Sequence, residues 1–191
     1  MKVWLIRHGM TRLGEEHRYQ GSLDESLSEA GRAALRTAEH SPRHVFVSPA
    51  KRARETAEIL FPEAEQIVCP DLREMDFGLF EGRGWWEMES DPAYLAWIES
   101  ECRDRCPGGE DRETFSGRVC AAFERILLRA GQEDEIVLVA HGGIQMAILE
   151  RYGTPERDYY RWQSPCGCGW ELEYSPETKK LSVQREIAFL R

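Results

Sequence analysis

The sequence predicts an α/β protein: a three-layer sandwich whose mostly parallel central sheet carries helices on both faces, with a hairpin at the end of the chain. Short apolar runs such as Lys2 to Ile6 and Glu135 to Ala140 have the Val, Ile and Leu content of buried strands. Between these runs lie stretches with helical spacing and helix-start signals. In such folds ligands bind at the carboxyl ends of the strands, so the residues that follow each strand are the first candidates for a site.

The first half of the chain alternates strand and helix. The first strand stops at Arg7-His8-Gly9. A helix is expected to open at Ser28, a suitable N-cap, and to run to about His40 with Leu27, Ala30, Ala34 and Ala38 on one face.

The next unit is a strand from Arg43 to Val47 that leads into Ser48-Pro49. We interpret this pair as an N-cap followed by proline at the first helical position. The helix should bury Ala53, Ala57 and Leu60, and Gln66 to Cys69 is a third strand candidate.

The second half begins with residues 84–131, which are predicted to be mainly helical with a break at 106–109. The strand Glu135 to Ala140 ends at His141-Gly142-Gly143, and a helix is expected to continue to about Tyr152. Trp170 to Tyr174 and Leu181 to Ile187 alternate as the two arms of a hairpin do.

Length and charge limit the function classes. The 191 residues contain no linker or repeat, so we expect a single domain over 1–191. The net charge of −9 argues against nucleic acid or an anionic membrane as a partner. No stretch has the length needed to cross a membrane, and the apolar run at the N-terminus is too short for a signal peptide, so a cytoplasmic protein is expected.

The six cysteines are expected to be mostly reduced thiols. Cys102/Cys106 and Cys166/Cys168 could form two halves of a metal site, but the spacings C-x3-C and C-x-C match metal knuckles poorly.

Three predicted strands lead to groups suited to phosphate. The first gives Arg7 and His8, the second leads to a helix whose first turns carry Arg52, and the Glu135 to Ala140 strand gives His141. Arginine supplies fixed bidentate donors for phosphoryl oxygens, and a neutral imidazole can attack phosphorus directly. A carboxyl group would protonate the leaving oxygen, and Glu74 and Asp76 can both approach the same edge.

Five ordered blocks of the sequence resemble those of the histidine phosphatase superfamily, which has the phosphoglycerate mutase-like fold. The resemblance spans about residues 1–175. The blocks are Leu5-Ile6-Arg7-His8-Gly9-Met10-Thr11, Arg18-Tyr19-Gln20-Gly21 with 27–31, Ser48-Pro49-Ala50-Lys51-Arg52-Ala53 with Thr56-Ala57, 72–78 with Glu81-Gly82, and Val139-Ala140-His141-Gly142-Gly143; Pro107-Gly108-Gly109-Glu110 resembles a substrate-side loop.

The resemblance implies a role for each matching residue. His8 matches the phosphorylated nucleophile, and Arg7, Arg52 and His141 match groups that bind the phosphoryl oxygens. Glu74 matches the acid that protonates the leaving group and then activates water. Contacts to phosphate or substrate are implied for Gln20, Gly21 and Gly142, and a helical lid for residues 84–112. No metal or other cofactor is implied.

The sequence departs from the family pattern at two places. Gly14 stands where Asn is usual, so one side-chain contact to phosphate is expected to be lost or supplied from elsewhere. Met10 stands where Glu or Gln is common.

The expected reaction is hydrolysis of a small phosphorylated metabolite by a monomer or homodimer. Phosphoglycerate mutases carry an inserted basic segment, whereas residues 91–106 here are acidic and aromatic. The chain most resembles short bacterial phosphatases that act on α-ribazole 5′-phosphate in cobalamin biosynthesis. The alternatives are a broad-specificity phosphatase, a mutase-type phosphoryl transfer, a non-catalytic phosphate-binding module and a metallohydrolase that uses His8 and His141. The arginines beside both histidines disfavour the metallohydrolase, because they would repel a divalent cation.

Overall fold

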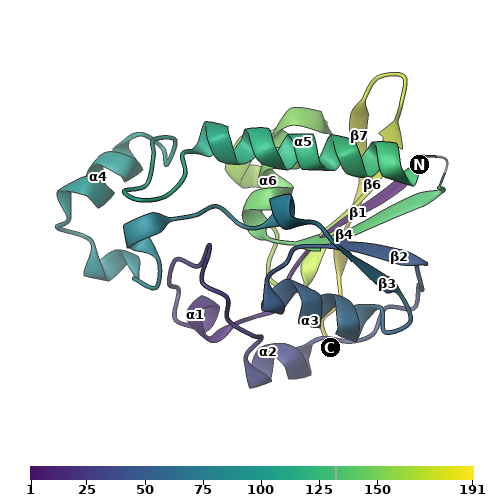
Figure 1. Ribbon diagram of the computed structural model, residues 1–191, viewed down its shortest axis with the longest axis horizontal. Coiled ribbons are helices and arrows are strands. Elements are labelled where there is room, and N and C mark those ends of the chain that lie inside the picture. Colours follow the sequence, from purple (N-terminus) through teal and green to yellow (C-terminus); the bar gives the residue numbers. More distant parts are fainter. Residues whose placement is uncertain (132) are drawn as a thin grey trace.

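The computed structural model describes residues 1–131 and 133–191, and a mixed sheet in the order β3-β2-β4-β1-β6-β7-β5 lies at its centre (Figure 1). The strands are β1 Lys2–Arg7, β2 His44–Val47, β3 Glu65–Val68, β4 Glu135–Ala140, β5 Gly153–Thr154, β6 Cys168–Ser175 and β7 Lys180–Ala188. The helices are α1 Arg12–Glu15, α2 Glu29–Ala34, α3 Lys51–Leu60, α4 Pro92–Glu99, α5 Arg112–Ala130 and α6 Gly142–Tyr152, with short 3₁₀ turns at 70–72, 78–80, 85–87 and 159–162.

Strand register brings the ends of three strands to one edge of the sheet. β1 runs parallel to β4 with Arg7 opposite Ala140, and β2 runs parallel to β4 with Val47 opposite Val139. The ladder continues past the strands, because the backbone N–H of His8 donates to Ala140 O and that of Ser48 to Val139 O. The residues after β1, β2 and β4 therefore meet at this edge, as the sequence predicted.

Both faces of the sheet are covered by helices, as Figure 1 shows with α5 and α6 on one side and α2 and α3 on the other. Successive side chains of β1 point to opposite faces of the sheet, so Val3 and Leu5 pack in the cluster that contains the buried side chains of α5 and α6. Trp4 and Ile6 belong to the opposite cluster, with the buried residues of α3. The predicted three-layer arrangement is confirmed, and so is the C-terminal hairpin, since β6 and β7 pair antiparallel.

The helix predicted from Ser28 to about His40 is wrong in its length. Ser28 is the N-cap as predicted, but α2 ends at Ala34. Leu35 has extended backbone (φ −77°, ψ 147°) and forms a bridge with Leu190 near the end of the chain. The predicted apolar face is wrong at Ala30 and Ala34, which are exposed, whereas Gly31 and Leu35 are buried; Leu27 is buried as predicted and Ala38 is half-buried. Contact with a distant segment thus overrides local helix propensity.

The predicted capping role of Ser48 is also wrong. Helix α3 begins at Lys51 with Ala50 as its N-cap and no side-chain capping bond. The hydroxyl of Ser48 instead contacts His141. The predicted burial of Ala53, Ala57 and Leu60 is confirmed. The two-residue strand β5 was not predicted, because so short a pairing leaves no sequence pattern.

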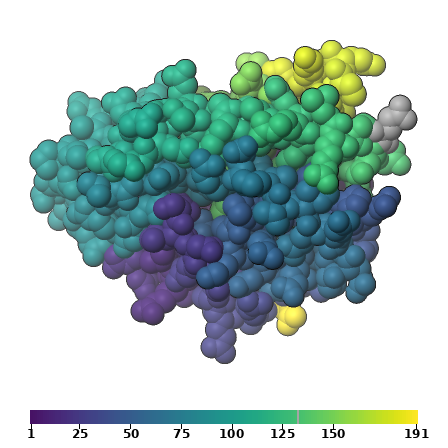
Figure 2. Space-filling view, viewed as in Figure 1, coloured from purple at the N-terminus to yellow at the C-terminus, as the bar shows by residue number. Residues whose placement is uncertain are grey.

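The segment between β3 and α5 crosses the carboxyl edge of the sheet and carries α4 away from it (Figure 1). In Figure 2 the purple segment after β1 lies against this teal segment. Backbone bonds hold the two together, since Tyr19 N donates to Arg83 O and Gly82 N donates to Tyr19 O. No helix among the described residues combines the length and apolar character that crossing a membrane requires.

Candidate active site

A cavity of about 340 Å³ opens at the edge where β1 and β4 end. Of the residues predicted to form a site, Arg7, His8, Gln20, Glu74 and Gly142 line this cavity. The predicted residues Arg52 and His141 do not line it and are almost completely buried, at 1% and 0% exposure. Its volume suits a small molecule.

His8 directly follows β1 and is buried, with its ring at the cavity wall. Nδ1 lies 2.7 Å from Gly9 O. A carbonyl oxygen can only accept, so Nδ1 carries the proton and Nε2 keeps its lone pair. Burial, followed by the charges of Arg52 and Arg7, holds the pKa of His8 well below its ordinary value. His8 is therefore a neutral imidazole with a free nucleophilic nitrogen.

The two arginines are fixed by backbone carbonyls. Arg7 Nη1 donates to Ser164 O at 2.8 Å. Arg52 donates from Nη1 to Leu23 O at 2.8 Å and from Nη2 to Gly21 O at 3.0 Å. Neither guanidinium is paired with a carboxylate among the described residues, so their positive charge is left for a bound anion.

His141 is the N-cap of α6, and its ring lies edge-on to that of His8 with centroids 5.2 Å apart. Nε2 is 2.7 Å from the hydroxyl of Ser48. Burial, and then the charges of Arg52, His8 and Arg7, lower the pKa of His141 well below its ordinary value. His141 is therefore also neutral at pH 7.

Glu74 approaches the same cavity from the segment after β3. Its two oxygens accept from the backbone N–H of Gly143 at 3.0 Å and of Met75 at 3.0 Å. Burial raises the pKa of Glu74 above its ordinary value, although these bonds and the two arginines oppose the shift. A Cβ at position 143 would lie 2.2 Å from Glu74 Oε1, so only glycine permits this contact. The raised pKa suits a carboxyl group that donates a proton.

Three nitrogens at this site have no hydrogen-bond partner within the described residues: Arg7 Nε, Arg52 Nε and His141 Nδ1. The two arginine N–H groups are buried donors, which are normally satisfied, and a phosphoryl group offers the acceptor oxygens that they lack. No group of three or more His, Cys, Asp or Glu side chains in the described residues is arranged to hold a metal ion.

The other residues for which a substrate contact was predicted do not all reach the cavity. Gln20 lines the cavity, but its amide is engaged by Thr11 Oγ1 and Glu25. Gly21 is outside the cavity lining and contributes the carbonyl that holds Arg52. Gly14 lines the cavity, and a Cβ there would meet Met10 Sδ at 2.9 Å, so Met10 would have to move for a larger residue.

Sequence reasoning missed two tyrosines of the aromatic cavity wall and the anchor of Arg7. Tyr159 and Tyr160 come from the 3₁₀ turn after β5, and Ser164 follows it. That segment has no periodicity or motif that could have signalled a site. The aromatic residues that line the cavity are Tyr19, Phe77, Trp97, Phe115, Tyr159 and Tyr160.

Protonation of the two buried histidines should weaken the fold. In the unfolded chain both would titrate near the ordinary value of about 6.5, whereas the folded chain resists protonation. We therefore expect the free energy of unfolding to fall by up to about 1.4 kcal/mol per pH unit for each histidine as the pH drops from 6.5 to 5.5. Urea unfolding at pH 7.5, 6.5 and 5.5 measures the slope. The double variant His8→Asn/His141→Asn should show a clearly smaller slope, and an equal slope would contradict the two lowered pKa values.

Comparison with known proteins places the chain among phosphate-handling enzymes. The family model described as histidine phosphatase superfamily (branch 1) matches residues 3–186. The chain is 29% identical over 205 residues to the adenosylcobalamin/alpha-ribazole phosphatase of Salmonella typhimurium, covering 100% of this chain and 99% of that protein.

Solved structures agree with this placement. The alpha-ribazole phosphatase of Shigella flexneri is similar with a TM-score of 0.78 at 26% identity, covering 96% of this chain and 95% of that one. A phosphoglycerate mutase from Thermus thermophilus is similar with a TM-score of 0.75 at 30% identity, covering 98% of this chain and 99% of that one.

Proposed function

The chain belongs to branch 1 of the histidine phosphatase superfamily, and we propose that it hydrolyses phosphate monoesters through a phosphohistidine formed on His8. It is a phosphoric monoester hydrolase that acts on a small phosphorylated metabolite, as its family and its phosphatase-named relatives indicate. The observation that carries the proposed intermediate is the bond from His8 Nδ1 to Gly9 O, which leaves Nε2 free at the cavity wall.

Phosphoryl transfer to His8 needs the charge of the transferred group to be neutralised and the leaving oxygen to be protonated. Arg7 and Arg52 supply the positive charge, and His141 offers its unpartnered Nδ1 to a phosphoryl oxygen. As Nε2 of His8 bonds to phosphorus, the phosphorus–oxygen ester bond breaks and Glu74 gives its proton to the departing alkoxide. Glu74, now ionised, takes a proton from water as the water oxygen bonds to phosphorus. The bond between phosphorus and Nε2 of His8 breaks, which releases inorganic phosphate and restores the neutral imidazole.

We propose that residues 1–191 act as one domain in which residues 84–112 form a lid over this cavity. Trp97 and Cys102 of that segment line the cavity, and so does Arg112 at its end. Trp85 and Trp86 are outside the cavity lining and are partly exposed, at 57% and 41%. The aromatic contribution of the lid to substrate therefore comes from Trp97.

We propose a substrate whose leaving group is flat and largely apolar, such as α-ribazole 5′-phosphate. The aromatic residues that line the cavity give such a group surfaces for stacking. The other arginines in the lining are already paired, Arg18 with Glu16 and Glu87 and Arg112 with Glu150. A second anionic group, such as the carboxylate of 3-phosphoglycerate, would find little free positive charge. The names of the alpha-ribazole phosphatase relatives support the same choice.

We further propose a cytoplasmic protein. The cysteines at 69, 102, 106, 120, 166 and 168 are all free, as is usual for a reducing compartment.

Phosphate release from a panel of monophosphates tests the substrate. The panel contains α-ribazole 5′-phosphate, 3-phosphoglycerate and p-nitrophenyl phosphate, each assayed with EDTA. We expect kcat/KM for the ribazole ester to exceed that for 3-phosphoglycerate by about 100-fold or more, because aromatic contacts are gained and a desolvated carboxylate is avoided.

Tyr159→Leu tests the stacking contact, because it keeps an apolar side chain but removes a stacking surface. It should lower kcat/KM for the ribazole ester and leave 3-phosphoglycerate nearly unchanged. Equal activity on all three esters would contradict the proposed substrate class, and inhibition by EDTA would contradict a metal-independent reaction.

A further inference from the structure

Arg118 donates several hydrogen bonds to the backbone of the segment that carries Glu74. We infer that Arg118, held by Glu110, is a positioning residue that fixes the catalytic acid, an inference that rests on the proposed role of Glu74 as that acid. Neither Arg118 nor Glu110 lines the cavity, and Arg118 bonds directly to the backbone of Glu74, so the proposed effect on the reaction passes through the position of Glu74.

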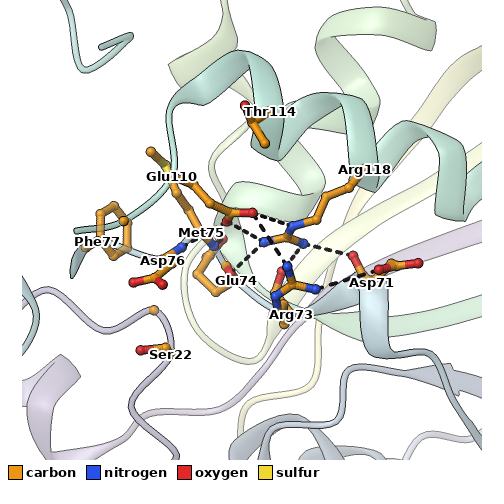
Figure 3. A network of polar contacts seen from close by, with 12 residues as sticks. Ser22, Asp71, Arg73, Glu74, Met75, Asp76, Phe77, Glu110, Thr114 and Arg118 are labelled. Atoms are coloured by element: carbon orange, nitrogen blue, oxygen red, sulfur yellow. Dashed lines mark hydrogen bonds and ion pairs between the residues drawn. The ribbon is translucent and has the colours of Figure 1, made fainter. Parts of the chain in front are cut away.

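Arg118 extends from α5 to the segment 71–76, as Figure 3 shows. Nη1 donates to Asp71 O at 3.0 Å and to Arg73 O at 2.8 Å, and Nη2 donates to Glu74 O at 2.9 Å. Three carbonyls within four residues are thus bound by one guanidinium. With its two further bonds to Glu110, all five N–H donors of the guanidinium are engaged, whereas a lysine ammonium has only three donors.

Glu110 completes the set of acceptors around the guanidinium (Figure 3). Its Oε1 and Oε2 accept from Arg118 Nε at 2.8 Å and Nη2 at 2.7 Å, a bidentate pair. Oε2 also accepts from the backbone N–H of Asp76 at 3.1 Å. Burial opposes ionisation of Glu110, but the bonds from Arg118 and Asp76 hold its pKa below the ordinary value. Both side chains are only 13% exposed, so solvent competes weakly with the pair.

The segment that carries Glu74 needs such support because it has little backbone pairing of its own. The N–H groups of Met75, Asp76 and Phe77 bind carboxylates of Glu74, Glu110 and Glu81 in place of backbone carbonyls. The carboxyl group of Glu74 must nevertheless stay within reach of Gly143 N and of the leaving oxygen. Small displacements of a catalytic group can cost orders of magnitude in rate.

The experiment compares two esters that differ in their need for an acid. The alkoxide of an alkyl monophosphate must be protonated as it leaves, whereas p-nitrophenolate leaves without assistance. We expect Arg118→Lys to lower kcat/KM for the alkyl ester by about tenfold or more and for p-nitrophenyl phosphate by less than about threefold. kcat/KM is the appropriate quantity because it excludes the later hydrolysis of the phosphohistidine, which is common to both esters.

Glu110→Gln is the second variant, and it tests the pair even if Arg118→Lys does not fold. It should show the same selective loss on the alkyl ester, in a smaller amount. Arg125→Met is the matched control, because Arg125 lies on the same helix and bonds to Asp71 through its exposed carboxylate and not through the backbone. It should leave both esters unchanged.

Glu74→Gln, alone and combined with Arg118→Lys, separates failure of this inference from failure of the proposed function. If Glu74→Gln shows no selective loss on the alkyl ester, the role of Glu74 itself is overturned. Suppose instead that Glu74→Gln loses kcat/KM selectively on the alkyl ester. The positioning role is then overturned if Arg118→Lys and Glu110→Gln lower kcat/KM equally for both esters, or leave it unchanged for both. If Arg118 acts through Glu74, adding Arg118→Lys to Glu74→Gln should cause no further selective loss of kcat/KM on the alkyl ester. An additive loss in the double variant would also overturn the positioning role.

Discussion

Replacement of His8 by Asn is expected to lower the rate of phosphate release from every ester by about four orders of magnitude or more. His8 is the only residue to which the proposed reaction assigns a covalent bond to phosphorus. Asn keeps a polar side chain of similar reach but has no nucleophilic nitrogen. Initial rates with p-nitrophenyl phosphate measure the loss, and the same variant should still bind inorganic phosphate, since Arg7, Arg52 and His141 are unchanged.

A labelled ester tests the intermediate directly. Wild-type protein mixed with a ³²P-labelled aryl phosphate and quenched in alkali should carry label, because phosphohistidine survives alkali, and the His8→Asn protein should carry none.

His17 provides a matched control, since it lines the same cavity and is exposed at its mouth. His17 has a φ of 51°, a left-handed conformation that Asn tolerates, so His17→Asn should keep nearly full activity. Substantial turnover by His8→Asn, or equal losses in the two variants, would contradict the nucleophile.

Replacement of Glu74 by Gln is expected to have the second-largest effect. The loss on an alkyl ester should be about 100-fold to 10,000-fold, and the loss in kcat/KM on p-nitrophenyl phosphate should be much smaller. Hydrolysis of the phosphohistidine should also slow, because Gln cannot activate water. Label should therefore accumulate on Glu74→Gln protein treated with the aryl ester.

The pH dependence of kcat/KM follows from the directions of the two pKa shifts. The reaction needs His8 neutral and Glu74 protonated, a combination that ordinary pKa values of about 6.5 and 4.3 would make rare. In this site the pKa of His8 is lowered by burial and two arginines, and that of Glu74 is raised by burial. Both shifts favour the reactive combination.

Activity on an alkyl ester should therefore fall on the acid side as His8 gains a proton and on the alkaline side as Glu74 loses one. The alkaline fall should vanish in Glu74→Gln. Asp76→Asn is the matched control, because Asp76 is a neighbouring carboxylate outside the cavity lining that accepts from Gly78 N. An alkaline fall that persists in Glu74→Gln but vanishes in Asp76→Asn would transfer the acid role to Asp76.

The sequence by itself determined the succession of main strands and helices along the chain and the edge of the sheet at which the chemistry is placed. These features could be predicted because they depend on local patterns. An apolar run such as Glu135–Ala140 indicates a strand that is buried on both faces. The residues that end neighbouring parallel strands lie at the same edge of a sheet. With β1 and β4 as parallel neighbours, this rule places His8 beside His141.

Tertiary structure alone decided what each side chain contacts. Ser48 has the sequence of a helix cap, yet its hydroxyl bonds to His141 because β2 and β4 are neighbours. Leu35 has the spacing of a helical residue, yet it forms a bridge with Leu190. The anchor of Arg7 at Ser164 and the support of the Glu74 segment by Arg118 join residues 157 and 44 positions apart in the chain. Such contacts depend on how distant segments pack, and no local pattern in the sequence records them.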